Sequence, residues 1–335
     1  MKPVIFGCEG PCLTDDERAF FKDAEPAGYI LFARNVEDRE QLRALTDSLR
    51  EIAGRDDLPI LIDQEGGRVA RMKPPVWPEF PAWGVFDKLY DVAPMSAIEA
   101  ARCNAHAIGL TLAEVGVTVD CLPLLDVRQP GASDVIGDRA LGSEPMRVAA
   151  LGRAVLDGLA LAGIAGIMKH IPGHGRAMVD THKDLPRVTA SAGELESDIE
   201  PFAKLSNTRM AMTAHIVFEA WDPDRCATLS PIVIEKVIRE RIGFDGLLFS
   251  DDLDMKALRG DRAGLAAKVV EAGCDIALNC WARMDEMIAT VERLPDIAEK
   301  SRKRLETAME GIRPDSQAGD LQELIAKRDA LLSHA

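Results

Sequence analysis

The sequence predicts a single (β/α)8 barrel. Short apolar runs alternate with helix-length segments about eight times along the 335 residues, a pattern typical of a parallel α/β fold. Charged or polar residues directly follow several of these runs, and a barrel gathers such residues from different strand ends at one face. A doubly wound sheet would concentrate its site at one switch point, usually behind an early glycine-rich phosphate loop. Gly66 and Gly67 do not fit that GxGxxG pattern, which favours the barrel.

Eight apolar runs are the expected strands of this barrel. Each is short and rich in the aliphatic residues that strands buried on both faces contain. They comprise residues 3–7, 28–32, 58–62, 117–121, 164–168, 209–214, 246–250 and 274–278.

Local signals mark where the intervening helices begin and end. Thr14 and Glu17 form a capping-box pattern ahead of one helix, and Gly54 follows another as its C-cap. Apolar positions share one face of residues 146–162, and Ser230 precedes a proline suited to the first helical position. These signals support helices between the predicted strands.

No linker or repeat divides the chain, so we expect one catalytic unit. Residues 1–312 form the predicted barrel domain, and residues 313–335 form a polar tail with a helix over residues 321–332. We expect this helix to pack on the outside of the barrel.

The composition argues against some classes of partner. A formal net charge of −15 disfavours binding to nucleic acid or to an anionic membrane surface, because both need basic patches. No apolar run reaches the length of a membrane span, and the first apolar piece is too short for a signal-peptide core. The seven cysteines are scattered and odd in number, which indicates reduced, packed thiols. We therefore expect a cytoplasmic protein.

The chemical centre of the chain is the stretch KHIPGHGR, residues 169–176, with Asp180 and His182 shortly after it. Three of the six histidines fall in this region. A predicted buried strand leads into the stretch, and its proline and glycines predict an irregular loop that carries the histidines. Because so many polar groups would be costly in a core, we expect an active site here.

Two further features could carry chemistry. Asp180 and His182 are separated by one residue, so in an extended loop the carboxylate can orient the imidazole and favour its protonated form. Asp251 ends the seventh apolar run, where a carboxylate could serve as nucleophile, base or metal ligand. Asp252 is expected to point elsewhere, because side chains alternate along a strand, or to cap the next helix.

Other charged residues lie on loops after other strands. Asp63 and Arg71 lie on either side of the glycines in DQEGGRVAR, and Arg139 follows the fourth expected strand. Such groups suit bidentate binding of hydroxyls or carboxylates, although a surface salt bridge is the commoner fate of a loop Arg-Asp pair.

A metal site is an alternative interpretation of the same region. It would combine the following side chains: His170, His174, His182, His215 and Asp251. The first strand lacks an HxH pair and the chain contains no HExxH motif, so the sequence favours chemistry without a metal.

Taken together, the motifs resemble those of family 3 glycoside hydrolases, and in particular the bacterial cytoplasmic β-N-acetylglucosaminidases of peptidoglycan recycling. DQEGGRV, VIGDRALG, KHIPGHG, MTAHIVF and GFDGLLFSDDLDM occur in the family's order and at roughly its spacing, over about residues 3–310. The family's single-domain members are (β/α)8 barrels. Ile171 and Thr181 stand where the family usually has Phe and Ser, which implies changed packing and retained activity.

The resemblance implies a role for each matching residue. Asp251 would be the nucleophile of a retaining mechanism, and His182, paired with Asp180, would be the acid/base. The implied sugar-binding residues are Asp63, Arg71, Arg139, Lys169 and His170. The implied substrate is a terminal β-1,4-linked N-acetylglucosamine on anhydro-N-acetylmuramic acid, with or without a peptide. No metal or organic cofactor is implied.

Other functions stay open. Some relatives use phosphate in place of water, so a phosphorylase is an alternative. Glucose or xylose specificity is less expected, because family members of that kind usually take their acid/base from a second domain. A sugar-sensing barrel without catalysis is the alternative from another class, although binding alone would not require Asp251, His182 and Asp180 together.

Overall fold

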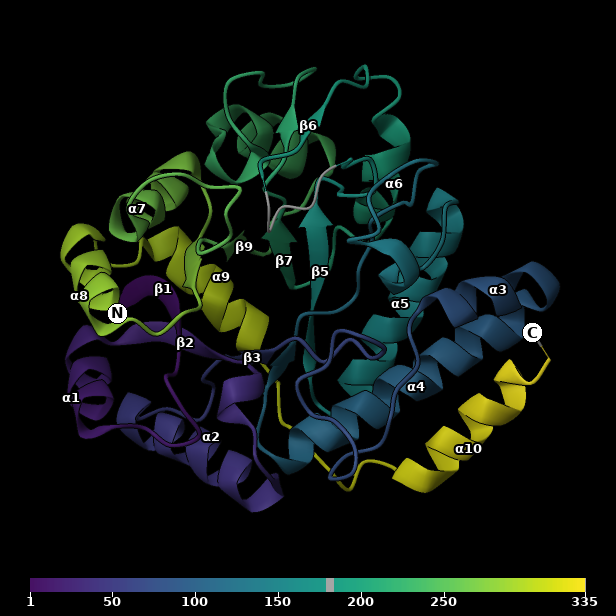
Figure 1. The fold of residues 1–335 in the computed structure, drawn as a ribbon, viewed down its shortest axis with the longest axis horizontal. Helices are drawn as coiled ribbons and strands as arrows, with labels where there is room; N and C mark the ends of the chain where they lie inside the picture. Colours follow the sequence, from purple (N-terminus) through teal and green to yellow (C-terminus); the bar gives the residue numbers. More distant parts are fainter. Residues whose placement is uncertain (179–183, 335) are drawn as a thin grey trace.

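Eight parallel strands close into a barrel in the order β1-β10-β9-β7-β5-β4-β3-β2 (Figure 1). The computed structural model describes residues 1–178 and 184–334. Each predicted apolar run overlaps one barrel strand, and the predicted (β/α)8 barrel is confirmed. The strands are β1 (Lys2–Gly7), β2 (Pro26–Leu31), β3 (Ile60–Ile62), β4 (Val119–Asp120), β5 (Ala165–Ile171), β7 (Met210–Thr213), β9 (Leu247–Asp252) and β10 (Ile276–Asn279).

Helices surround the barrel strands (Figure 1). The α-helices are α1 (Asp15–Ala24), α2 (Arg39–Ala53), α3 (Gly84–Val92), α4 (Pro94–Glu114), α5 (Pro145–Leu161), α6 (Glu196–Lys204), α7 (Arg262–Ala272), α8 (Met284–Arg293), α9 (Glu299–Met309) and α10 (Leu321–Leu332). Shorter or wider helical segments are η1 (Ala33–Asn35), η2 (Gly137–Arg139), η3 (Ala227–Leu229) and the π-helix η4 (Val233–Arg241). A separate two-stranded sheet pairs β6 (Arg187–Val188) with β8 (Val217–Phe218).

Side-chain and glycine caps place several helix ends where the sequence predicts them. Thr14 Oγ1 accepts the Glu17 amide, and the Glu17 carboxylate accepts the Thr14 amide, which completes the capping box of α1. Gly54 ends α2 in the left-handed conformation, with a φ of 64°. Ser230 Oγ accepts the Val233 amide at 3.1 Å, as expected of a cap. These boundaries depend on chemistry within one turn of the chain.

Two apolar layers fill the fold. Alternate strand residues such as Ile5, Leu61 and Phe249 fill the barrel interior, while Val4 and Phe6 belong to the outer layer beneath the helices. Helix α9 contributes to the interior layer and binds the segments that precede β7 and β9, so it closes the end where the strands begin. The filled interior leaves space for functional side chains at the opposite, carboxyl end.

Strand β5 extends beyond the run predicted for it. The Lys169 amide donates to the Pro123 carbonyl at 3.0 Å, and Ile171 pairs with Thr213 of β7. Lys169 and His170 are therefore strand residues, and the expectation that the whole histidine stretch lies on a loop is wrong in this respect. Hydrogen bonding to neighbouring chain segments lengthens the strand.

Helix α10 lies on the outer side of the barrel against α4 and α3 (Figure 1). Arg328 Nη1 on α10 donates to Asn104 Oδ1 on α4 at 3.0 Å. All seven cysteines are free, and all but Cys12 are buried, as the sequence predicts. Over the described part of the chain, no helix combines the length and the apolar character needed to cross a membrane.

Candidate active site

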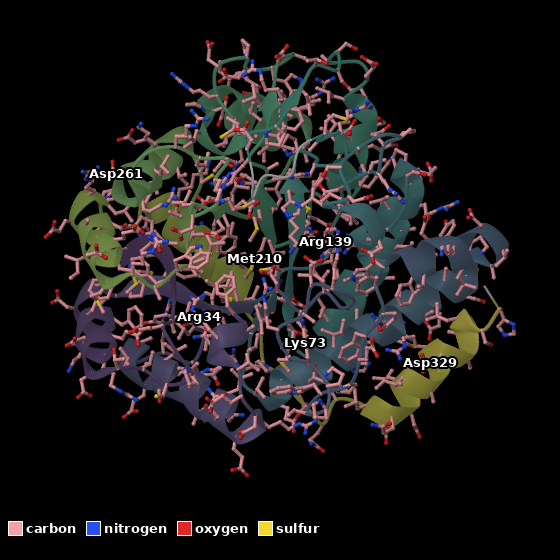
Figure 2. The ribbon with its side chains drawn as sticks, viewed as in Figure 1. Arg34, Lys73, Arg139, Met210, Asp261 and Asp329 are labelled. Atoms are coloured by element: carbon pink, nitrogen blue, oxygen red, sulfur yellow. The ribbon has the colours of Figure 1, made fainter. Side chains whose placement is uncertain are left out.

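A cavity of about 240 Å³ opens at the carboxyl ends of the barrel strands. Six of the predicted site residues line it: Asp63, Arg71, Arg139, Lys169, His170 and Asp251. They come from β5, from β9 and from the segments that follow β3 and β4, and Arg139 lies near the middle of the view in Figure 2. Apolar side chains, among them Phe32, Ile136, Met212 and Leu278, complete the wall. The expected convergence of strand ends is present in the structure.

Two carboxylates hold three cations in the cavity wall. Lys169 Nζ lies 2.9 Å from Asp63 Oδ1 and 2.7 Å from Glu65 Oε1. Arg139 binds the two Glu65 oxygens at 2.8 and 2.7 Å, and Arg71 Nη2 lies 3.0 Å from Asp63 Oδ2. The side chains of Lys169 and Glu65 are only 2% and 0% exposed, so solvent screens these pairs weakly.

The ion pairs keep these groups charged despite their burial. Burial by itself raises the pKa of the Asp63 carboxyl, but Lys169 and Arg71 outweigh burial and hold this pKa below its usual value. Burial by itself lowers the pKa of Lys169, but Asp63 and Glu65 raise that pKa above its usual value. The wall therefore presents fixed charges that can bind hydroxyl and amide groups.

A tight turn after β3 brings Arg71 back to Asp63. The Gly66 amide donates to the Val69 carbonyl at 3.0 Å. Gly66 and Gly67 have φ values of 98° and 54°, a region that glycine adopts without steric cost. The turn therefore explains the paired glycines of the DQEGGRV motif.

Asp126 lies beneath the histidine stretch and contacts two of its residues. Its Oδ1 accepts the His170 amide at 3.1 Å and the His174 amide at 2.7 Å, and its Oδ2 lies 2.8 Å from His170 Nδ1. Burial, with His170 beside it, lowers the pKa of His174 to about 4. Asp126 was not among the site residues predicted from the sequence. The sequence could have indicated it, because Asp126 is a carboxylate directly after the apolar run 121–125, just as Asp251 ends an apolar run.

Asp251 and Asp252 both line the cavity at the end of β9. The pairing of β9 with β10 shifts register between Phe249 and Asp252, which interrupts the alternation of side chains. The expectation that Asp252 points elsewhere is therefore wrong, and Asp261 caps α7 instead. Burial and the neighbouring carboxylates of Asp254 and Asp251 raise the pKa of Asp252 to about 7.

His215 lies beside the end of β9 and does not line the cavity. Its Nε2 donates to the Asp252 carbonyl at 2.9 Å, and its Nδ1 lies 2.8 Å from Thr228 Oγ1. In this structure, His215 is therefore not placed with the other candidate metal ligands considered from the sequence. Within residues 1–178 and 184–334, no three His, Cys, Asp or Glu side chains are placed to hold a metal ion.

Asp180 and His182 lie outside the described residues, so their pairing stays a prediction. The described segment before them is held against the loop that follows β4. The Ala177 amide donates to the His174 carbonyl at 3.1 Å, and the Ser133 amide donates to the Ala177 carbonyl at 2.9 Å.

A closed barrel with ionised side chains from several strand ends around one cavity defines a (β/α)8-barrel enzyme with a polar pocket. The chain matches the family description "Glycosyl hydrolase family 3 N terminal domain" over residues 10–313. It belongs to glycoside hydrolase family 3, and the resemblance inferred from the motifs is confirmed.

Relatives with assigned names cover most of the chain. The β-hexosaminidase of Alkalilimnicola ehrlichii is 39% identical over 303 residues, which are 88% of this chain and 84% of that protein. The β-hexosaminidase of Aromatoleum aromaticum is 36% identical over 324 residues, which are 95% of this chain and 89% of that protein. The crystal structure of NagZ from Neisseria gonorrhoeae in complex with N-trifluoroacetyl-D-glucosamine matches with a TM-score of 0.89 and 32% identity. That match covers 99% of this chain and 98% of the NagZ chain.

Proposed function

We propose that this protein is a retaining exo-β-N-acetylglucosaminidase. The observation that carries the proposal is the cavity of a family 3 barrel that Asp251 lines together with a wall of fixed charges. The β-hexosaminidase names of the relatives support the reaction class. The N-trifluoroacetyl-D-glucosamine bound to the gonococcal protein supports an N-acylated glucosamine as the ligand class.

The charged wall suits the hydroxyl and acetamido groups of such a sugar. Asp63 can accept hydroxyl protons, while Lys169 and Arg139 can donate to hydroxyl and carbonyl oxygens. Arg71 and His170 would complete the sugar-binding set. Because ion pairs already immobilise Lys169 and Arg139, little side-chain entropy is lost when the sugar binds.

The proposed reaction has two covalent steps. First, a carboxylate oxygen of Asp251 bonds to the anomeric carbon while the bond from that carbon to the leaving oxygen breaks, and His182 gives its proton to the leaving oxygen. Asp180 would orient His182. Then water bonds to the anomeric carbon, His182 takes a proton from the water, and the ester bond to Asp251 breaks. Two inversions at one carbon retain its configuration.

The proposed substrate is a terminal β-1,4-linked N-acetylglucosamine on 1,6-anhydro-N-acetylmuramic acid, with or without a peptide. With this substrate the enzyme would act in cytoplasmic peptidoglycan recycling. Residues 1–312 would be the catalytic domain, and residues 313–335 a helical tail.

The test is release of nitrophenol from 4-nitrophenyl β-N-acetylglucosaminide by the wild type and by Asp251→Ala. Asp285→Ala is the matched control, because Asp285 is exposed on α8. We expect chelator-resistant activity in the wild type and the control, and loss of nearly all turnover in Asp251→Ala.

The same assay separates the alternatives. A rate that depends on added phosphate would indicate a phosphorylase. Sugar binding by an inactive wild type would indicate a sensing barrel. Loss of activity with chelator would indicate a metal-dependent reaction.

A further inference from the structure

The Asp126 carboxylate is fully buried and makes three hydrogen bonds to the KHIPGHG stretch. In two of these bonds, Oδ1 accepts from the backbone amides of His170 and His174, and a backbone amide can only donate. The third joins Oδ2 to the His170 ring. Burial by itself raises the pKa of Asp126, but His170 outweighs burial and lowers it to about 2, so the group is a carboxylate near neutral pH.

An ionised carboxylate has no proton to donate, and this determines the state of the facing ring nitrogen. The proton between Asp126 Oδ2 and His170 Nδ1 must belong to Nδ1. His170 lines the cavity, so Nε2 is the ring nitrogen left for a ligand there. In a neutral ring with the proton on Nδ1, Nε2 accepts a hydrogen bond.

The backbone of the histidine stretch leaves little space beside the segment that carries Asp126. A Cβ added to Gly175 would lie 1.9 Å from the Val127 carbonyl oxygen. The Gly173 amide also donates to the His170 carbonyl at 2.7 Å. Close backbone packing therefore holds the histidine stretch against the segment that carries Asp126.

We infer that Asp126 is a positioning residue that keeps a proton on His170 Nδ1 and orients Nε2 toward the sugar. The orientation of Nε2 toward a sugar rests on the proposed function. The position of the proton on the ring does not, because the contacts between Asp126 and His170 are present in the chain without a ligand. Asp126 itself does not line the cavity.

The decisive variant is Asp126→Asn. Asparagine retains an oxygen for the two backbone amides and replaces only Oδ2 with an NH2 group, which can donate but not accept. We expect the His170 proton to move to Nε2, so that the ring presents a donor to the cavity. Nitrogen-15 NMR of the imidazole rings in the ligand-free protein measures this directly, with the His170 signals assigned by their loss in His170→Gln.

Kinetics provide the second measurement. We expect kcat/KM for 4-nitrophenyl β-N-acetylglucosaminide to fall about tenfold to a hundredfold in Asp126→Asn, mainly through a higher KM. In a His170→Ala background the same change should have little further effect, because Asp126 acts through that ring.

Asp222→Asn is the matched control. Asp222 is also buried and also accepts three hydrogen bonds, from the Asp224 and Arg225 amides and from Ser230 Oγ, but it does not line the cavity. We expect the His170 signals and the kcat/KM of Asp222→Asn to match those of the wild type.

A His170 ring with Nδ1 unprotonated in the wild type would overturn the inference, and this measurement holds even if Asp126→Asn does not fold. An Nδ1 proton unchanged in Asp126→Asn, or an equal kinetic loss with and without His170, would also overturn it. An inactive wild type whose His170 proton still moves in Asp126→Asn would overturn the proposed function and support the positioning role.

Discussion

Replacing Glu65 with glutamine tests whether the buried ion pairs stabilise the cavity wall. Glu65 is 0% exposed, and its Oε1 lies 2.7 Å from both Lys169 Nζ and Arg139 Nη2. At an effective dielectric constant of about 20, each contact supplies roughly 6 kcal/mol of attraction before desolvation is subtracted. Glutamine keeps the shape and one acceptor oxygen but removes the charge, so Arg139 loses its ion pair with Glu65 and Lys169 keeps only its ion pair with Asp63.

Removing one partner of a buried ion pair costs about 3–5 kcal/mol. Because the amide oxygen of glutamine still accepts a hydrogen bond, we expect Glu65→Gln to lower the free energy of unfolding by about 3 kcal/mol, the lower end of that range. Urea unfolding followed by tryptophan fluorescence measures the change. The control Glu51→Gln, exposed on α2, should differ from the wild type by less than about 0.5 kcal/mol. An unfolding free energy of Glu65→Gln equal to that of the control would show that the Glu65 charge does not stabilise the cavity wall.

Three further predictions concern the same end of the barrel. Gly175→Ala should reduce glycosidase activity about a hundredfold, because its Cβ would meet the Val127 carbonyl and displace the histidine stretch. Gly193→Ala, with nothing within 4 Å of the added Cβ, should match the wild type, and equal activity of the two variants would contradict this account. The pKa of Asp126 is lowered to about 2, so its stabilising contribution is complete above about pH 4 and is lost as the pH falls toward 2. The urea midpoint should decrease over that window, and a constant midpoint would show that the carboxylate contributes nothing. The pKa of Asp252 is raised to about 7, so kcat/KM should show an ionisation near neutral pH that is absent in Asp252→Asn. An unchanged profile in that variant would assign the ionisation to another group.

Much of the fold could be predicted from local patterns. Each of the eight apolar runs overlaps a barrel strand, and helix α10 has the predicted bounds. Apolar periodicity and caps depend on residues within a few positions, so they are visible in one sequence. Strands β5 and β9 end at later residues than predicted, because hydrogen bonds to neighbouring chain segments extend these strands.

The site was predictable only in part. Asp63, Lys169 and Asp251 could be selected because each follows or ends an apolar run. Glu65 and Asp126 were not selected as site residues, since their importance depends on distant partners. Lys169 and Asp63 are 106 positions apart, and His170 and Asp126 are 44 apart.

Local patterns in the sequence were enough to identify which segments become strands, where several helices start and stop, and which chemical groups stand at the strand ends. They were enough because backbone preference and apolar periodicity are short-range properties. Three-dimensional packing established which carboxylate faces which cation, that Asp252 joins Asp251 in lining the cavity, and that His215 does not line it. Those outcomes depend on distance and burial, which also set the ionisation of each group, and neither can be read from separation along the chain.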